Sequence, residues 1–247
     1  MSQLRKEERI AKHLARAGLC SRREAERMIA EGRVVVDGTT LETPAFLVTS
    51  ESQVTVDGKP IAGAKPAELW RYHKAPGLIT SHKDVQGRPT VFESLPKGLG
   101  RVLSVGRLDL ASEGLLLLTN DGGLAGQLER SDWLRRYRVR VYGRPNDTKL
   151  KSLAEGITVD GVHYGPISAE IDSQNASNAW LTLGLREGKN REIRRVLEHF
   201  GLQVNRLIRT AYGPFQLGSL KRSQVVRIPP KVVREQLRES HNADRRR

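Results

Sequence analysis

The sequence contains a single cysteine, Cys20, among 247 residues. One cysteine cannot form an internal disulfide or a thiolate metal cluster, which favours a reducing compartment. The six histidines lack any His-x-x-x-His spacing, so we expect no metal site. No run approaches the ~18 to 20 apolar residues that a membrane helix needs, and the first ten residues lack the apolar core of a signal peptide. We therefore predict a cytoplasmic protein.

Acidic residues are too few to balance the basic ones. The chain has 42 Lys and Arg against 28 Asp and Glu, a formal charge of +14. Apolar residues make up 38% of the chain and aromatic residues only 5%, which is typical of a folded but polar and loop-rich protein. A large positive charge without a membrane segment predicts a polyanionic partner, most simply nucleic acid.

Two short helices are predicted near the N-terminus. Ile10 and Leu14 lie at helical spacing, and Gly18 ends that pattern. Ser21 precedes a glutamate at capping-box spacing, so the second helix should begin at Arg22. A run of three valines followed by Asp-Gly then predicts a strand that enters a tight turn.

Basic side chains gather on the second of these helices. Arg23 and Arg27 are one turn apart, Arg22 is beside them, and the first helix supplies Arg16. These side chains could straddle phosphates, or they could form a solvated face whose charge the neighbouring glutamates offset. The residues alone leave both interpretations open.

The segment from Arg9 to Gly38 resembles the S4 RNA-binding domain. The resemblance rests on the order Gly-x-x-Ser-Arg-Arg-x-x-Glu and on the Val-x-Val-x-Gly hairpin that follows it. It implies two helices on a small antiparallel sheet over residues 4–60, followed by a flexible linker near residues 56–66. It also implies that RNA is bound by Lys12, Arg16, Arg22, Arg23 and Arg27.

A carboxylate with apolar neighbours stands out in the segment VGRLDLASEGLLLLTNDG, residues 105–122. Its apolar run Leu115–Leu118 predicts a buried strand. Just upstream, Asp109 lies between two leucines, where a carboxylate is costly unless it is paired or hydrogen-bonded. Asp109 is therefore a candidate catalytic group. The alternative is that it caps the following turn or pairs structurally with Arg107.

Residues 134–145 alternate as a strand with two unlike faces. Tyr137 shares one face with two valines, and it is either a core residue or a ring on which a base stacks. The opposite face predicts phosphate contacts from Arg136, Arg138 and Arg140.

A helix is predicted after Asn190, which we expect to be its N-cap, and Gly201 should end it. Its apolar stripe is flanked by three arginines. Because an arginine at the edge of a buried stripe can present its guanidinium to a carboxylate, Arg194 is a candidate partner for Asp109. Spacing alone does not show that the two meet.

Five segments together resemble the RsuA/RluB family of pseudouridine synthases, with the RluB branch as the nearest match. They are GRLDLASEGLLLLTNDG, the strand around Tyr137, EGKNREIRR, LIRTAYGPFQLG and WRYHKAPGLITSHKDVQGRPTVFESLP. The resemblance extends to about residue 230. It implies an α+β fold in which the S4 domain precedes a catalytic domain, residues 67–230, with a mixed, mostly antiparallel sheet and a central cleft.

The same resemblance implies the site residues. Asp109 would be the catalytic aspartate, Tyr137 would stack on the target base, Arg194 would pair with the aspartate, and Ile193 would lie beside the base. Further substrate contacts are expected from Arg107 and Asn190. Further RNA contacts are expected from Arg191 and Arg195.

The implied reaction breaks the bond between ribose C1′ and uracil N1 and rejoins the base through C5, and it needs no cofactor. The expected target is 23S ribosomal RNA, free or in an assembly intermediate, bound by a monomer. Two alternatives are the same reaction on 16S ribosomal RNA and a non-catalytic S4-type ribosome-assembly factor. An aminoacyl-tRNA synthetase is a less favoured interpretation of the S4 domain, because no His-x-Gly-His signature or Gly-rich nucleotide loop occurs.

Residues 231–247 are predicted to be a frayed helix or a disordered basic tail.

Overall fold

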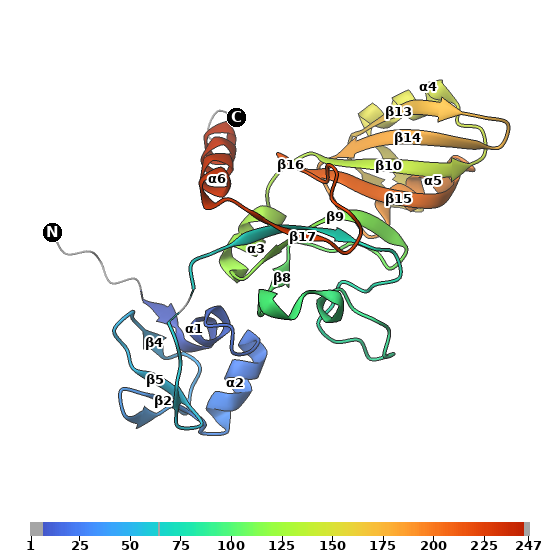
Figure 1. The fold of residues 1–247 in the computed structure, drawn as a ribbon. Helices are drawn as coiled ribbons and strands as arrows, with labels where there is room; N and C mark the ends of the chain where they lie inside the picture. Colours follow the sequence, from blue (N-terminus) through green and yellow to red (C-terminus); the bar gives the residue numbers. More distant parts are fainter. Residues whose placement is uncertain (1–6, 64, 245–247) are drawn as a thin grey trace. The chain divides into compact units, whose positions relative to one another are not determined.

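The computed structural model describes residues 7–63 and 65–244, and the side chains up to residue 238 (Figure 1). It divides into two compact units. The first comprises residues up to Glu68 together with Lys97–Leu103 and Asn120–Leu124, and the second comprises the rest of the chain.

The first unit packs two helices on small antiparallel sheets, as the sequence predicts. The helices are α1 (Ile10–Arg16) and α2 (Arg22–Ala30). A four-stranded sheet has the order β3-β2-β5-β6, with β2 (Val34–Val36), β3 (Thr39–Thr40), β5 (Val54–Val56) and β6 (Lys59–Pro60). A second sheet pairs β1 (Glu8–Arg9) with β4 (Leu47–Val48).

Local signals explain how the first unit begins. The Ser21 hydroxyl accepts a hydrogen bond from the Glu24 amide at 3.1 Å, so the predicted cap of α2 is confirmed. The turn after β2 has positive φ at both Asp37 and Gly38, the geometry of a two-residue hairpin.

The prediction of a linker near residues 56–66 is wrong at its start. Residues up to Pro60 belong to the β5–β6 hairpin, and Ile61 packs against the apolar core of the unit. The hairpin continues because the Asp-Gly at residues 57–58 repeats the turn chemistry of the first hairpin, with positive φ at both residues.

The second unit is built on a nine-stranded sheet. Its main path has the order β13-β14-β10-β15-β9-β7-β17, with β16 added to β15 and β8 added to β9. The β15–β9 pair is parallel, whereas six other pairs of this sheet are antiparallel, so the sheet is mixed and mostly antiparallel, as predicted. The strands are β7 (Leu69–Lys74), β8 (Leu103–Ser104), β9 (Ser112–Thr119), β10 (Arg135–Tyr142), β13 (Ile167–Gln174), β14 (Asn178–Leu185), β15 (Gln203–Tyr212), β16 (Phe215–Gln216) and β17 (Val225–Ile228).

Helices and a separate hairpin accompany this sheet (Figure 1). The α-helices are α3 (Gly122–Glu129), α4 (Asp147–Lys151), α5 (Glu192–His199) and α6 (Pro230–Asp244). Short 3-10 turns of this unit are η1 (Phe92–Ser94) and η3 (Ser152–Glu155), whereas η2 (Lys97–Leu99) belongs to the first unit. The hairpin joins β11 (Ile157–Val159) to β12 (Val162–Tyr164).

Strand β9 is the centre of the core. All eight of its residues are buried, and Leu115–Leu118 are completely inaccessible, which confirms the predicted buried strand. The strand begins at Ser112, three residues earlier than the leucine run, and therefore directly after the loop that carries Asp109. A Cβ at Gly114 would lie 2.4 Å from the Arg209 carbonyl oxygen, so only glycine allows β15 to approach this closely.

The C-terminal segment is helical where it is described. Residues Pro230–Asp244 form α6, and Val233 is buried, so the disordered alternative for this segment is wrong up to residue 244. Valines at positions 232 and 233 supply the apolar contact that a basic tail alone would lack. In the described parts of the chain, no helix combines the length and the apolar content needed to cross a membrane.

Candidate active site

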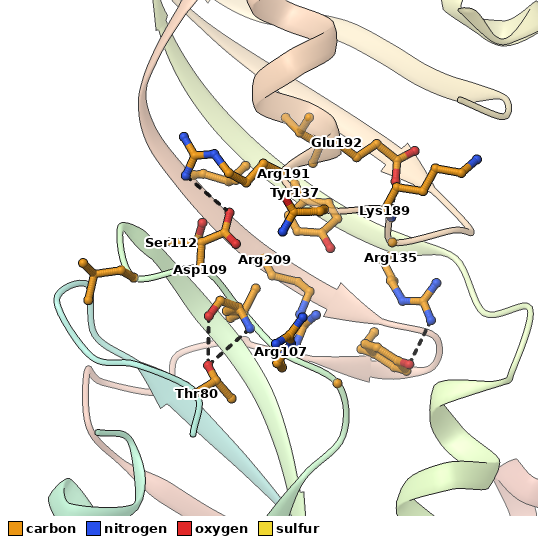
Figure 2. A pocket seen from close by; sticks show the side chains of 18 of the residues that line it. Thr80, Arg107, Asp109, Ser112, Arg135, Tyr137, Lys189, Arg191, Glu192 and Arg209 are labelled. Atoms are coloured by element: carbon orange, nitrogen blue, oxygen red, sulfur yellow. Dashed lines mark hydrogen bonds and ion pairs between the residues drawn. The ribbon is translucent and has the colours of Figure 1, made fainter. Parts of the chain in front are cut away.

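One pocket of about 930 Å³ in the second unit collects most of the predicted site (Figure 2). It is lined by side chains from the loop before β9, from β10 and β15, and from the start of α5. The predicted residues among its lining are Arg107, Asp109, Tyr137, Asn190 and Ile193, together with Arg191. Residues distant in the sequence are thus brought together around the Asp109 carboxylate.

The pocket is not the apolar crevice expected from the neighbours of Asp109. Leu108 turns inward and is 8% exposed, whereas Leu110 faces solvent. The lining includes six basic side chains, which are Arg88, Arg107, Arg135, Lys189, Arg191 and Arg209. A cavity of this composition suits a polar, negatively charged ligand.

Hydrogen bonds to the backbone shape the Asp109 loop. The Thr80 hydroxyl donates to the Leu108 carbonyl at 2.9 Å and accepts from the Leu108 amide at 3.3 Å. The Gly106 amide donates to the Glu129 carboxylate at 2.7 Å. The Ser112 amide donates to the Asp109 carbonyl at 3.0 Å. The loop is therefore fixed on both sides of Asp109, while the Asp109 carboxylate itself stays available.

Lys74, which sequence reasoning missed, donates hydrogen bonds to backbone carbonyls at the end of the same loop. It is completely buried, and its ammonium donates to the carbonyls of Ser112 at 2.7 Å and Ala75 at 3.1 Å. Burial lowers the pKa of Lys74 to about 8, although the charges of Asp109 and Glu113 oppose that shift. Only its position two residues after Tyr72, on the buried face of β7, hinted that Lys74 is buried.

The ion-pair partner of Asp109 is Arg191. Its Nη1 lies 4.0 Å from Asp109 Oδ2, and the two side chains are 51% and 33% exposed (Figure 2). Arg191 is the N-cap of α5 and has a left-handed backbone with φ of 50°. The prediction that Asn190 is the N-cap is therefore wrong by one residue, because the left-handed turn delays the helix.

The predicted Asp109–Arg194 ion pair is wrong. The Arg194 guanidinium donates to the Val204 carbonyl at 3.0 Å and to the Ala111 carbonyl at 3.4 Å, and it does not line the pocket. These two carbonyls lie within its reach, so the side chain ties α5 to β15 and to the loop. Burial lowers the pKa of Arg194, as does the charge of Arg191, while Asp109 opposes the shift.

Strand β10 alternates as predicted. Tyr137 is 8% exposed and faces the pocket, whereas Arg136, Arg138 and Arg140 are exposed on the other face and do not line it. Arg138 lies over the Trp180 ring with its Cζ 4.7 Å from the centroid, and it pairs with Asp172 at 3.5 Å. Arg195 is likewise exposed and outside the pocket.

Two buried arginines in the pocket were also missed. Arg135 shares the Tyr137 face of β10 and is 8% exposed, and its Nη2 donates to the Tyr212 hydroxyl at 3.0 Å. Arg209 on β15 is 3% exposed. The alternation of β10 could have revealed Arg135, because it lies two residues before Tyr137. Nothing in the local sequence marks Arg209, which follows the buried Leu207 at strand spacing.

A second carboxyl group lines the pocket at Glu192. It is 3% exposed, and its Oε2 accepts the Lys189 amide at 2.8 Å while its Oε1 is buried without a partner. Burial raises the pKa of Glu192 to about 7, and the nearby Glu187 carboxylate adds to that shift. A helix-start glutamate is an ordinary surface residue by pattern, so the sequence did not single it out.

The predicted RNA-binding residues of the first unit differ in how they are paired. Arg16 and Lys12 both pair with Glu8, at 2.9 Å and 3.4 Å. Arg27 pairs with Glu24 on the same helix and with Glu31 at its C-cap. Within the described part of the chain, Arg22 and Arg23 are exposed and form no ion pair. Of the predicted set, these two side chains are therefore the ones whose charge no carboxylate of the described residues pairs with.

The arrangement offers an accessible carboxylate, an aromatic ring and fixed positive charges in one cavity. A carboxylate of this kind can act as a nucleophile or as a base. Across residues 7–63 and 65–244, no three His, Cys, Asp or Glu side chains are grouped so that they could hold a metal ion.

Comparison with known proteins identifies the chain. The RNA pseudouridylate synthase family model matches residues 68–199, and the S4 domain model matches residues 8–54. An RNA pseudouridine synthase of Rickettsia prowazekii is 50% identical over 93% of this chain and 97% of its own. The ribosomal large subunit pseudouridine synthase B of Escherichia coli K12 is 40% identical, over 85% of this chain and 75% of its own. A crystal structure of a pseudouridylate synthase, 22% identical, shares the fold with a TM-score of 0.64 over 92% of this chain and 99% of its own. The chain therefore belongs to the RsuA/RluB family of RNA pseudouridine synthases.

Proposed function

We propose that this pseudouridine synthase isomerises a uridine of 23S ribosomal RNA, as part of ribosome biogenesis in the cytoplasm, and that it acts as a monomer on free RNA or on an assembly intermediate. The relative from E. coli, named as a large-subunit enzyme, supports this target. The charge of +14 supports a polyanionic substrate. The S4 domain supports binding to RNA outside the pocket.

Asp109 is the catalytic residue of the proposal, and the observation that carries it is the position of its carboxylate in the pocket. The carboxylate is one-third exposed, faces the same cavity as Tyr137, and has one loosely held cation as its partner. It either attacks C1′ or takes a proton from the sugar while the base departs. Because the electrons of the broken bond stay on the base and return through C5, no cofactor is required.

The target uridine must leave its stack to reach Asp109. Flipping costs a few kcal/mol and is least costly in loops and single strands. Tyr137 supports the flipped base by stacking, and Ile193 at 5% exposure closes the apolar side of the pocket. Arg107 and Asn190 are exposed at its rim, where they contact the nucleotide. Arg191 takes the pairing role that the sequence had suggested for Arg194.

Phosphate contacts across both units offset the cost of flipping. The first unit supplies Lys12, Arg16, Arg22, Arg23 and Arg27, and the second supplies Arg136, Arg138, Arg140 and Arg195. Such contacts release counterions, which makes affinity depend on salt. We expect Arg22 and Arg23 to contribute most within the first unit, because no carboxylate competes for them.

The deciding experiment maps pseudouridines across the ribosomal RNAs of cells with the protein, without it, and with Asp109→Asn in its place. We expect one 23S position to lose its pseudouridine in the second and third strains. Loss at a 16S position would keep the reaction and overturn the target. Unchanged maps in both strains would contradict an enzymatic role on ribosomal RNA and favour a non-catalytic assembly factor.

Salt dependence tests the proposed S4 contacts. Replacing both Arg22 and Arg23 with glutamine should weaken RNA binding and reduce the slope of log affinity against log salt by about 1.4 to 1.8, if each contacts one phosphate. Arg33→Gln is a matched control, because that exposed arginine is engaged by Asp57 at 2.7 Å. An unchanged slope in the double variant would remove both residues from the interface.

A further inference from the structure

Arg209 is the most deeply buried arginine facing the pocket. Its strand, β15, lies between β10 and β9, where Arg209 is paired across the sheet with Tyr137 on one side and Gly114 on the other. The missing side chain of Gly114 lets the Arg209 backbone come this close. The register therefore sets Arg209 beside the ring proposed to hold the base, and Figure 2 shows it facing the same hollow as Asp109 and Tyr137.

The guanidinium of Arg209 is held in place from one side only. Its Nε donates to the Leu115 carbonyl at 2.7 Å, and its Cζ lies 5.2 Å from the centroid of the Tyr212 ring. Its Nη2 is buried and has no hydrogen-bond partner. Among the ion pairs formed by the described residues, none includes Arg209. A buried cation without a carboxylate partner is costly in an apolar setting.

The reaction creates an anion inside the pocket that Arg209, which forms no ion pair there, can stabilise. When the C1′–N1 bond breaks, its electron pair leaves with N1, and the base becomes a uracil anion whose charge spreads over N1, O2 and O4. The sugar is completed either by a new bond from Asp109 to C1′ or by loss of the C2′ proton to Asp109 with formation of a C1′–C2′ double bond. C5 of the anion then attacks C1′ as Asp109 leaves, or as it returns the proton to C2′. The C5 proton is finally lost to water, and N1 takes one up.

We infer that Arg209 donates from Nη2 to a carbonyl oxygen of the departing uracil and stabilises the anion in the transition state. A fixed donor aimed at charge that develops during the reaction accelerates it, because it is already oriented before the bond breaks. The inference rests on the proposed function, since it assigns a role within the same pocket. Arg209 is then a catalytic residue beside Asp109.

A uracil oxygen suits this site better than a backbone phosphate does. Phosphates of bound RNA are contacted by exposed basic side chains, whereas Arg209 is 3% exposed and lies opposite Tyr137. The test must nevertheless separate the two oxygens, because a guanidinium binds either one.

The experiment compares uridine with 5-fluorouridine at the target position of one RNA segment. Fluorine withdraws electrons and stabilises the uracil anion without help from the protein. Fluorine at C5 cannot leave as the C5 proton does, so 5-fluorouridine stops once C5 is bonded to C1′. Single-turnover loss of the N1–C1′ linkage, which both substrates undergo, is therefore followed for the wild type, Arg209→Gln and Arg209→Lys, and RNA affinity is measured separately. We expect Arg209→Gln to slow uridine turnover by about 10²- to 10³-fold, with affinity unchanged, and to slow 5-fluorouridine turnover at least tenfold less. Arg209→Lys, which keeps the charge, should lose less on uridine.

Comparing two substrates with one protein preparation removes the effect of misfolding. Any inactive fraction lowers both rates equally, so the ratio of the two rates reports only on the base. Arg144→Gln is the matched control, because Arg144 is exposed, lies outside the pocket and also donates its Nε to a backbone carbonyl, that of Ala176. Its ratio should equal that of the wild type.

The outcomes separate this inference from the proposed function. Equal losses on both substrates would overturn the role of Arg209 in stabilising the anion. A loss of affinity that depends on salt, with the turnover rate preserved, would overturn it in favour of a phosphate contact. If the wild type itself converts no uridine in the mapped ribosomal segment, the proposed target fails before any arginine variant is compared.

Discussion

Asp109 and Glu113 are carboxylates four residues apart that face opposite sides of the central sheet. Glu113 is 3% exposed and is held by Arg206 and by Arg222, the latter at 2.8 Å. Burial by itself would raise the pKa of Glu113, but these two guanidinium groups outweigh it and lower that pKa. Asp109 is 33% exposed, and its one ion pair is 4.0 Å long.

The difference separates a carboxylate whose oxygens are fully paired from one whose oxygens are accessible to a ligand. Both oxygens of Glu113 are occupied by donors, which leaves none free for a substrate. Asp109 keeps its oxygens accessible because its loop is fixed through backbone groups and not through its side chain. The same short segment therefore holds the charge of Glu113 firmly and leaves that of Asp109 accessible in the pocket. If Asp109 is catalytic as proposed, variants at the two positions should separate turnover from stability.

The largest expected effect is on turnover at Asp109. Asp109→Asn removes the nucleophile or base and should lower pseudouridine formation by about 10³-fold or more, with RNA affinity and unfolding free energy nearly unchanged. Single-turnover assays and binding titrations measure the two quantities. Asp147→Asn, at an exposed position of α4, is the control. Activity near that of the wild type would remove Asp109 from catalysis.

Glu113→Gln should produce the opposite pattern. Breaking a buried ion pair is destabilising, and because both arginines are about half exposed we expect a loss of about 2 to 3 kcal/mol. A lowered pKa in the folded state means that this stability is present above the unfolded pKa of about 4.5 and is lost as pH falls through the folded value. Urea unfolding at pH 7 and pH 3.5 should therefore show a smaller gap between variant and wild type at the lower pH. An equal gap at both pH values would contradict this origin.

Features that rest on local periodicity could be predicted from the sequence. The Ser21 cap, the buried leucine run of β9 and the alternation around Tyr137 each depend on neighbours within a few residues. The catalytic segment was found by its resemblance to a family, because one aspartate between two leucines does not by itself specify a reaction.

Features that depend on distant contacts were missed or wrong. Lys74 and Arg209 are buried because carbonyls of β9 and of its preceding loop accept their hydrogen bonds, and no local pattern encodes those partners. The structure pairs Asp109 with Arg191 at the start of α5, because the Arg194 guanidinium donates to the carbonyls of Val204 and Ala111. A left-handed backbone at a residue other than glycine, such as the φ of 50° at Arg191, is uncommon and cannot be predicted from the local sequence.

Glu192 extends the comparison to a carboxyl group that is buried but not ion-paired. Its pKa of about 7 lies above the unfolded value of about 4.5, so the folded state binds more protons and stability falls as pH rises from 4.5 to 7. Glu192→Gln lacks this loss and can still accept the Lys189 amide. We expect the variant to gain about 2 to 3 kcal/mol relative to the wild type between pH 5 and pH 8. Urea unfolding measures this gain, with the exposed Glu155→Gln as control, and a constant difference at both pH values would contradict it.

The smallest expected effect concerns the cation beside Asp109. The Asp109–Arg191 pair is long and solvent-exposed, so it should contribute no more than about 1 kcal/mol, and Arg191→Ala should lower turnover about three- to fivefold. That loss should shrink at high salt, because exposed charges are screened. Arg194→Ala breaks hydrogen bonds to two backbone carbonyls, so it should lower stability more than Arg191→Ala does and should show little dependence on salt. The opposite result, a salt-dependent loss of turnover in Arg194→Ala and none in Arg191→Ala, would contradict this assignment. It would support the pairing of Asp109 with Arg194 that the sequence predicted, so that Arg194 and not Arg191 would be the partner of the Asp109 carboxylate during the reaction.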